Sequence, residues 1–172
     1  METNWNPIIW NQYGAAIDML ENAIRACPDE LWSDPSKPPQ WISRDVPGFW
    51  YVAYHTLFFL DYDLSESEKE FAPPTPFTLD ELDPAGLLPE RAYTKDELLA
   101  YLADGREKCR RFIDSLTGDR ARERCVFERR EMSVAELLLH SMRHVQHHTA
   151  QLNLMLRQKM DAAPRWVSFA KA

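Results

Sequence analysis

The segment from Ser133 to Gln158 reads SVAELLLHSMRHVQHHTAQLNLMLRQ and contains four of the five histidines of the chain, namely His140, His144, His147 and His148. At about 100° per residue, a helical wheel gathers its large apolar side chains into one stripe. His148 lies within this stripe and His144 lies at its margin, one turn earlier. The segment therefore predicts a long amphipathic helix that presents an i, i+4 pair of imidazoles to the element it packs against.

Two imidazoles at this spacing can share one cation, and the alternative is a pair of hydrogen-bonded histidines in or beside a core. His140 lies nearer the edge of the stripe and His147 is rotated among polar neighbours, so we expect these two to be outer or surface groups. The fifth histidine, His55, stands alone in the most apolar stretch, FWYVAYHTLFFLDYDL. A metal shared by His55, His144 and His148 would explain an imidazole in such surroundings.

Length and composition limit the class of protein. A chain of 172 residues predicts a single domain, residues 1–172, that can bury a core without disulfides or metals. A net charge of −7 disfavours nucleic acid as a partner. Cys27, Cys109 and Cys125 are an odd number without CxxC spacing, which favours a reducing cytoplasm. We see neither a signal peptide nor an apolar run of membrane-spanning length, so we expect no membrane partner.

Four segments carry helical patterns, and no segment has a convincing strand pattern. A first helix opens at Asn6-Pro7 and ends near Pro28, with apolar residues every three or four positions. A second runs from about Pro47 to Ser65 and is apolar around almost its whole circumference, which predicts burial on several sides. Asp61 and Asp63 are expected to close its end toward solvent, although Asp63 is also considered as a partner that orients an imidazole.

The third helix begins with a capping box at Thr94 to Glu97 and stops at Gly118, and a second capping box at Ser133 to Glu136 opens the histidine helix. Cys109 and Gly105 lie on the core stripe of the third helix, where the glycine permits close approach of another helix. Between helices two and three, residues 66–93 form a long proline-rich connection with one short helical turn at Leu79 to Leu82.

The remaining connections are expected to be loops. Trp32 and Trp41 should cap one end of the core, residues 119–130 should be a charged connection, and the tail after Met160 should pack or face a dimer partner. The fold class is therefore all-α, a four-helix bundle with a long Pro-rich connection between helices two and three.

A lone histidine in the second helix, followed late in the chain by His-x-x-His-His and Thr-x-Gln-Leu, resembles the DinB/YfiT-like superfamily. The matching fragments are WYVAYHTLFFLDYDL and RHVQHHTAQLNLMLRQ. The resemblance covers essentially the whole chain and implies a bundle, a homodimer, and a divalent metal held by three histidines. By motif position these are His55, His144 and His148, the residues that the helical wheel prefers.

Three imidazoles leave a coordination position open, which is typical of a catalytic metal site. The leading hypothesis is a metal-dependent S-transferase that uses a low-molecular-weight thiol on a small electrophilic substrate, with zinc or nickel as the expected metal among several that imidazole suits. Hydrolysis is a second catalytic option, with Glu136 or Asp63 as candidate bases. The alternative to an enzyme is a non-catalytic metal-binding or dimeric interaction protein of a stress or DNA-damage response.

Overall fold

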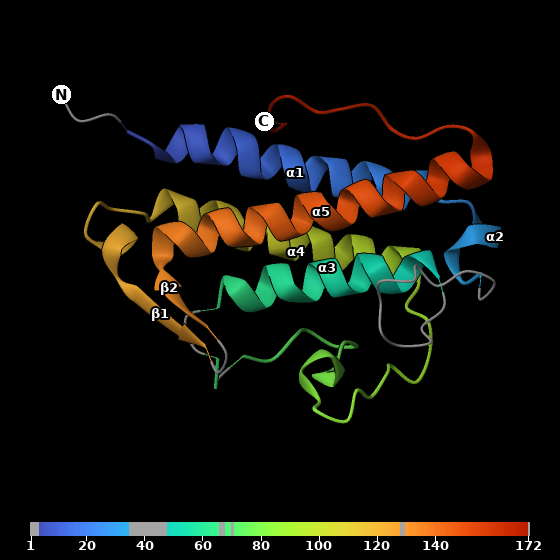
Figure 1. The fold of residues 1–172 in the computed structure, drawn as a ribbon, viewed down its shortest axis with the longest axis horizontal. Helices are drawn as coiled ribbons and strands as arrows, with labels where there is room; N and C mark the ends of the chain where they lie inside the picture. Colours follow the sequence, from blue (N-terminus) through green and yellow to red (C-terminus); the bar gives the residue numbers. More distant parts are fainter. Residues whose placement is uncertain (1–3, 35–47, 66–67, 70, 128–129, 172) are drawn as a thin grey trace.

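The structure is a computed structural model, and it describes residues 4–34, 48–65, 68–69, 71–127 and 130–171. Four long helices form the body of the molecule: α1 (Asn6–Ala26), α3 (Phe49–Asp63), α4 (Lys95–Asp114) and α5 (Val134–Met160). Helix α5 packs on α3 and α1, and α4 packs on the same two helices from the other side, so the four close into a bundle (Figure 1). The all-α four-helix bundle is confirmed.

Both predicted capping boxes are present. The Thr94 hydroxyl accepts a hydrogen bond from the backbone N–H of Glu97, whose carboxylate accepts one from the N–H of Thr94. Ser133 and Glu136 do the same at the start of α5. Each box satisfies backbone donors that an uncapped helix would leave without partners, and so fixes where the helix begins.

Helix α3 is the most buried of the long helices, as its apolar circumference predicted. Of its 15 residues, 13 are buried, and only His55 and Phe59 are partly exposed. Gly105 of α4 lies against it: a Cβ atom built there would be 3.2 Å from Cδ2 of Leu60. The glycine on the α4 stripe therefore permits the close approach that the sequence indicated, and Cys109 beside it is fully buried.

The prediction that Asp61 and Asp63 face solvent is wrong. Asp63 is 1% exposed and pairs with Arg130, while Asp61 accepts hydrogen bonds from Lys108 Nζ at 2.5 Å and from the Tyr101 hydroxyl at 2.9 Å. Buried carboxylates need such partners to offset the loss of hydration. The partners come from α4 and from the segment before α5, far away in the sequence.

The charged connection between α4 and α5 contains a small hairpin that we did not predict. After a short 3₁₀ turn, η2 (Arg120–Arg122), strands β1 (Arg124–Phe127) and β2 (Arg130–Ser133) pair antiparallel, with Cys125 opposite Met132. The hairpin leads directly into α5 (Figure 1). Each strand has only four residues, which is too short for the apolar alternation that marks a strand in a sequence to stand out.

The long connection between α3 and α4 runs past the outer side of α3 (Figure 1). Its described part contains the expected short turn, the 3₁₀ helix η1 (Asp80–Leu82). Phe77 anchors this segment, because its ring stacks on Tyr101 with centroids 4.4 Å apart and on Tyr54 at 5.8 Å. The Tyr54 hydroxyl also donates to the Thr78 carbonyl at 3.1 Å.

A four-residue helix, α2 (Asp29–Trp32), follows α1. Trp32 is buried there and its indole N–H donates to the Tyr93 carbonyl at 2.9 Å, as expected for a residue that caps the core. Trp41, for which the same role was predicted, lies outside the described residues.

The segment after α5 turns back along α1, which confirms that the tail packs (Figure 1). Ala170 N–H donates to the Asn11 carbonyl at 3.0 Å, and the Lys171 N–H donates to the buried carboxylate of Asp18 at 2.7 Å. Gly14 makes room for the tail, because a Cβ there would lie 2.6 Å from Cβ of Ala170.

Among the helices of the described ranges, none has the length and apolarity needed to cross a membrane.

Candidate metal centre

Three histidines from two helices meet at one point of the bundle. His55 comes from α3, and His144 and His148 come from successive turns of α5, the helix that packs directly on α3. Nε2 of His144 lies 3.3 Å from Nε2 of His55 and 3.0 Å from Nε2 of His148. Each offers one ligand atom, and these atoms lie within 4.8 Å of one another, so the group can hold a metal ion.

The outer nitrogens of two of the rings face acceptor oxygens. Nδ1 of His55 lies 2.9 Å from Oε2 of Glu81, and Nδ1 of His148 lies 2.6 Å from Oε1 of Gln151. A neutral imidazole carries its proton where a neighbouring acceptor can receive it. Both rings are therefore assigned the Nδ1–H form, which leaves the lone pair of each Nε2 directed at His144.

The inner nitrogens have too few protons to satisfy one another. If His144 carried its proton on Nε2, it could donate to only one of the two facing lone pairs. Nδ1 of His144 is itself buried and has no hydrogen-bond partner among the described residues. A cation between the three Nε2 atoms would satisfy all three lone pairs at once.

Two of the three nitrogen separations match the spacing that a shared ion requires, and the whole group lies within 4.8 Å. Zinc–nitrogen bonds of about 2.0–2.1 Å place ligands on adjacent corners of a tetrahedron about 3.3 Å apart. The two measured Nε2 separations, 3.3 Å and 3.0 Å, lie at and slightly below that length. The three imidazoles would occupy three corners and leave the fourth open.

Burial keeps two of the rings neutral. It lowers the pKa of His144 to about 2, with repulsion from His148 and His55 adding to the effect. Burial also lowers the pKa of His148 to about 4, where His55 adds repulsion and the bond to Gln151 opposes it. Neutral imidazole is the form that binds metal, so at pH 7 both residues are ready to act as ligands without losing a proton.

Aromatic rings surround the cluster. The Phe59 ring lies 4.9 Å from the ring of His55 and 5.5 Å from that of His144, and Tyr51 lies 6.4 Å from His55. The His55 side chain is 27% exposed, whereas that of Glu81 is 5% exposed. The centre is thus walled by apolar surface and still reaches solvent on the side of His55.

His140 and His147 lie outside the cluster, as the helical wheel indicated. Nε2 of His140 accepts a hydrogen bond from Arg130 at 2.8 Å, because a guanidinium can only donate. His147 is exposed, and its Nε2 faces Gln151 Nε2 at 3.0 Å. His147 therefore touches the residue that orients His148 but does not face the centre.

The two candidate bases occupy other positions. Glu136 is exposed and caps α5, and its bonds to Ser133 lower its pKa. Asp63 is buried, which raises its pKa against the opposing effect of Arg130, and it is not among the three grouped ligands. The carboxylate that orients an imidazole is Glu81, which the sequence analysis missed because nothing distinguishes it from the other acidic residues of residues 66–93.

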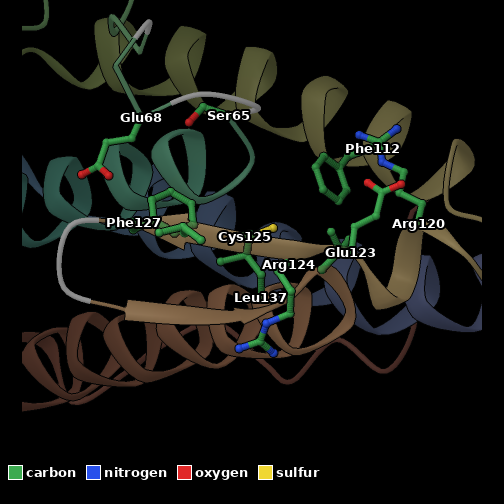
Figure 2. Close-up of a pocket in the computed structure, with 11 residues that line it drawn as sticks. Ser65, Glu68, Phe112, Arg120, Glu123, Arg124, Cys125, Phe127 and Leu137 are labelled. Atoms are coloured by element: carbon green, nitrogen blue, oxygen red, sulfur yellow. The ribbon is translucent and has the colours of Figure 1, made fainter.

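A separate cavity of about 450 Å³ lies at the hairpin end of the bundle (Figure 2). It is bordered by β1, by the end of α4 and by the residues after α3, and Cys125 lines it together with Arg120 and Glu123. None of the three clustered histidines lines it. Cys125, the most exposed of the three cysteines, therefore lines a cavity that is separate from the candidate metal centre.

The family model for the DinB superfamily matches residues 12–152, which is most of the chain and spans all three clustered histidines. The chain belongs to the DinB superfamily. No individual curated protein matches the sequence. Membership in the DinB superfamily agrees with the helical bundle and with a three-histidine group that can hold a metal.

Proposed function

We propose that this DinB-superfamily protein is a divalent-metal-dependent enzyme that transfers a low-molecular-weight thiol to a small electrophile. The observation that carries the proposal is the convergence of the Nε2 atoms of His55 and His148 on Nε2 of His144. Histidines that only satisfied one another would pair each lone pair with an N–H, whereas a single proton on Nε2 of His144 can pair with only one of the two facing nitrogens.

A metal ion held by three imidazoles supplies an open Lewis-acidic position, at which a thiol is held as its thiolate. The reaction balances without an oxidant. The thiol gives its proton to solvent, a carbon–sulfur bond forms, and the bond to the leaving group breaks with its electron pair going to that group. His55, His144 and His148 would hold the ion, and Phe59 and Tyr51 form an apolar wall beside these histidines that would limit the access of water.

Zinc or nickel is the proposed metal. The cluster contains only imidazole nitrogen, a donor that suits both ions, and it contains neither the thiolates nor the several carboxylates that would favour copper(I) or magnesium. The cysteines are free thiols, and this supports a cytoplasmic location, where thiols stay reduced.

Elemental analysis of the purified protein, combined with cobalt substitution, tests the proposal. We expect about one divalent ion per chain, and we expect the cobalt spectrum to gain a sulfur-to-cobalt charge-transfer band when glutathione or cysteine is added. Thioether formation should then be measured with chlorodinitrobenzene as the electrophile. A full metal complement with a cobalt spectrum that no thiol changes would overturn the transferase proposal and favour a non-catalytic metal-binding protein.

A second role, as a dimeric interaction protein, is supported by a different observation. Trp166 and Phe169 of the tail are 66% and 67% exposed, although the tail itself is fixed along α1. Two large aromatic side chains held rigidly in solvent are typical of residues covered by another chain. We propose that they lie in a homodimer interface, which is compatible with the enzyme.

A further inference from the structure

Glu81 belongs to the long connection between α3 and α4, and its side chain reaches the histidine cluster. Its Oε2 lies 2.9 Å from Nδ1 of His55, on the edge of the ring opposite to the nitrogen that faces His144. The Glu81 side chain is 5% exposed, so this bond is shielded from water. His55 is therefore held between a carboxylate on one edge and the α5 histidine pair on the other.

We propose that Glu81 is a positioning residue for the metal: it accepts the Nδ1–H of His55, keeps the Nε2 lone pair aimed at the centre, and ties the long connection to metal occupancy. The proposal rests on the proposed metal site. Glu81 cannot ligate the same ion in this arrangement, because the imidazole ring stands between the carboxylate and the centre. It acts through His55, as a carboxylate behind a metal-bound histidine does generally.

The outer edges of the three imidazoles differ in their surroundings. His55 has a carboxylate, His148 has the neutral amide of Gln151, and Nδ1 of His144 has no hydrogen-bond partner among the described residues. A negative charge on the outer edge makes an imidazole a stronger donor than a neutral amide does. Since a divalent ion bound by three neutral ligands keeps its full charge, the carboxylate of Glu81 behind His55 would also help to offset it.

The position of Glu81 is fixed by contacts of its own segment with α3. Thr78, three residues earlier, accepts the hydrogen bond of Tyr54, and Tyr54 directly precedes His55. The 3₁₀ turn then closes with the Leu82 N–H on the Leu79 carbonyl at 2.9 Å. The same stretch of α3 thus carries both the ligand and the anchor of the turn that orients it, so loss of order in the turn would release the His55 ring.

The adjacent carboxylate provides a matched control. Asp80 is half-buried and accepts an exposed hydrogen bond from the Thr78 hydroxyl at 2.5 Å, whereas the carboxylate facing His55 is that of Glu81. Asp80→Asn removes the same charge from the same turn as Glu81→Gln. A difference between these two variants therefore reports the contact with His55 rather than the overall charge of the segment.

The test measures Zn²⁺ affinity by competition with a chromogenic chelator, using the full chain and the variants Glu81→Gln, Glu81→Leu and Asp80→Asn. We expect Glu81→Leu to weaken Zn²⁺ binding by about 10- to 100-fold, Glu81→Gln by less, and Asp80→Asn by no more than about twofold. The visible d–d bands of bound Co²⁺ should shift in both Glu81 variants and stay unchanged in Asp80→Asn. Melting curves identify any variant that fails to fold. If Glu81→Leu does not fold, the test uses Glu81→Gln, which keeps an acceptor oxygen.

Limited proteolysis adds a readout that does not depend on the strength of metal binding. Saturating Zn²⁺ should protect residues 71–93 from cleavage in the wild type and in Asp80→Asn, and should protect them less in Glu81→Leu. Wild-type affinity in a folded Glu81→Leu variant, with unchanged cobalt bands, would overturn the role of Glu81 and leave the metal site standing. Failure of the wild type to bind Zn²⁺, Ni²⁺ or Co²⁺ would instead overturn the metal site, and the role of Glu81 with it.

Discussion

Nε2 of His148 lies 3.0 Å from Nε2 of His144, so two imidazoles one turn apart on α5 point at the same place. Side chains four residues apart on a helix are neighbours on its surface, so both rings can face one point. His55 of α3 faces the same point, and the group therefore lies in the interface between the two helices.

Replacing His148 by Ala should weaken divalent-metal binding more than about 100-fold, because a ligand is removed and the remaining pair holds an ion poorly. Replacing the exposed His147 by Ala should change the affinity by less than about tenfold, since His147 contacts Gln151 and the ring of His148 but is not one of the three clustered ligands. Calorimetric titration with Zn²⁺ measures both. Equal losses from the two changes would show that the ligands are wrongly assigned.

Changing Cys27, Cys109 and Cys125 singly to Ser or Ala should leave thiol transfer within about tenfold, or about 1.4 kcal/mol in the barrier. Burial raises the pKa of the Cys27 thiol to about 12 and raises that of Cys109 and Cys125 as well, so none is a ready nucleophile at pH 7. His55→Ala should reduce the rate far more. Cys109 is fully buried, so a melting curve must accompany its variant.

A folded Cys109 variant that kept its metal and lost activity would place the nucleophile on the protein and contradict the proposed chemistry.

Arg130→Leu should destabilise the protein by about 3–5 kcal/mol, because it leaves the buried carboxylate of Asp63 without its cation. The matched control is Arg124→Leu in the same hairpin. Arg124 pairs with Glu131 at 3.0 Å with both side chains more than half exposed, and such a pair contributes less than about 1 kcal/mol. Urea unfolding measures both, and similar losses would mean that the buried pair contributes no more than the exposed one.

The free energy of unfolding should decrease in acid, and part of this decrease should depend on Glu97. Hydrogen bonds from Arg91 and from Thr94 lower the pKa of Glu97 from its ordinary value of 4.5 to about 2. The unfolded chain therefore binds this proton at a higher pH than the folded chain, so the stabilisation is complete above pH 4.5 and disappears as pH falls toward 2.

Glu97→Gln should accordingly be less stable than the wild type at pH 6, with a difference that shrinks as the pH approaches 3. Arg91→Met should reduce the same pH-dependent part, because it removes the bidentate partner of Glu97. Thermal melts from pH 6 to pH 3 measure the effect. A difference that stayed constant over this range would contradict the assignment.

Sedimentation should show a dimer at micromolar concentration, and the double change Trp166→Gln with Phe169→Ser should shift it toward monomer. Val126→Ser is the matched control, because Val126 is 70% exposed on the hairpin, away from the tail. A wild type that sediments only as monomer, or a control that dissociates equally, would count against the tail as the interface.

The four long helices could be predicted from sequence because each has either an apolar stripe at helical spacing or a continuous apolar surface, and two have capping boxes. The clustering of His55, His144 and His148 followed from the same periodicity together with the family resemblance. These signals are local, since they depend on residues within a few turns of one another.

The parts that were missed depend on contacts between distant segments. Glu81 is one of many acidic residues in a proline-rich stretch, and only the path of the chain brings it to His55. Asp63 at a helix end looks like a solvent-facing group until Arg130, 67 residues later, is placed beside it. The hairpin strands, at four residues each, are too short to leave a periodic pattern.

The division of the three histidines between two helices has a consequence for the order of events during folding. Helix α5 carries two of them and can capture an ion weakly once that helix has formed, whereas His55 can join only after α3 has docked. In a refolding experiment with Co²⁺, the first colour change would therefore time the formation of α5, and the final spectrum would time the docking of α3. The spectrum of the bound ion would thus report the docking of α3 on α5 separately, a step that fluorescence averaged over six tryptophans does not resolve.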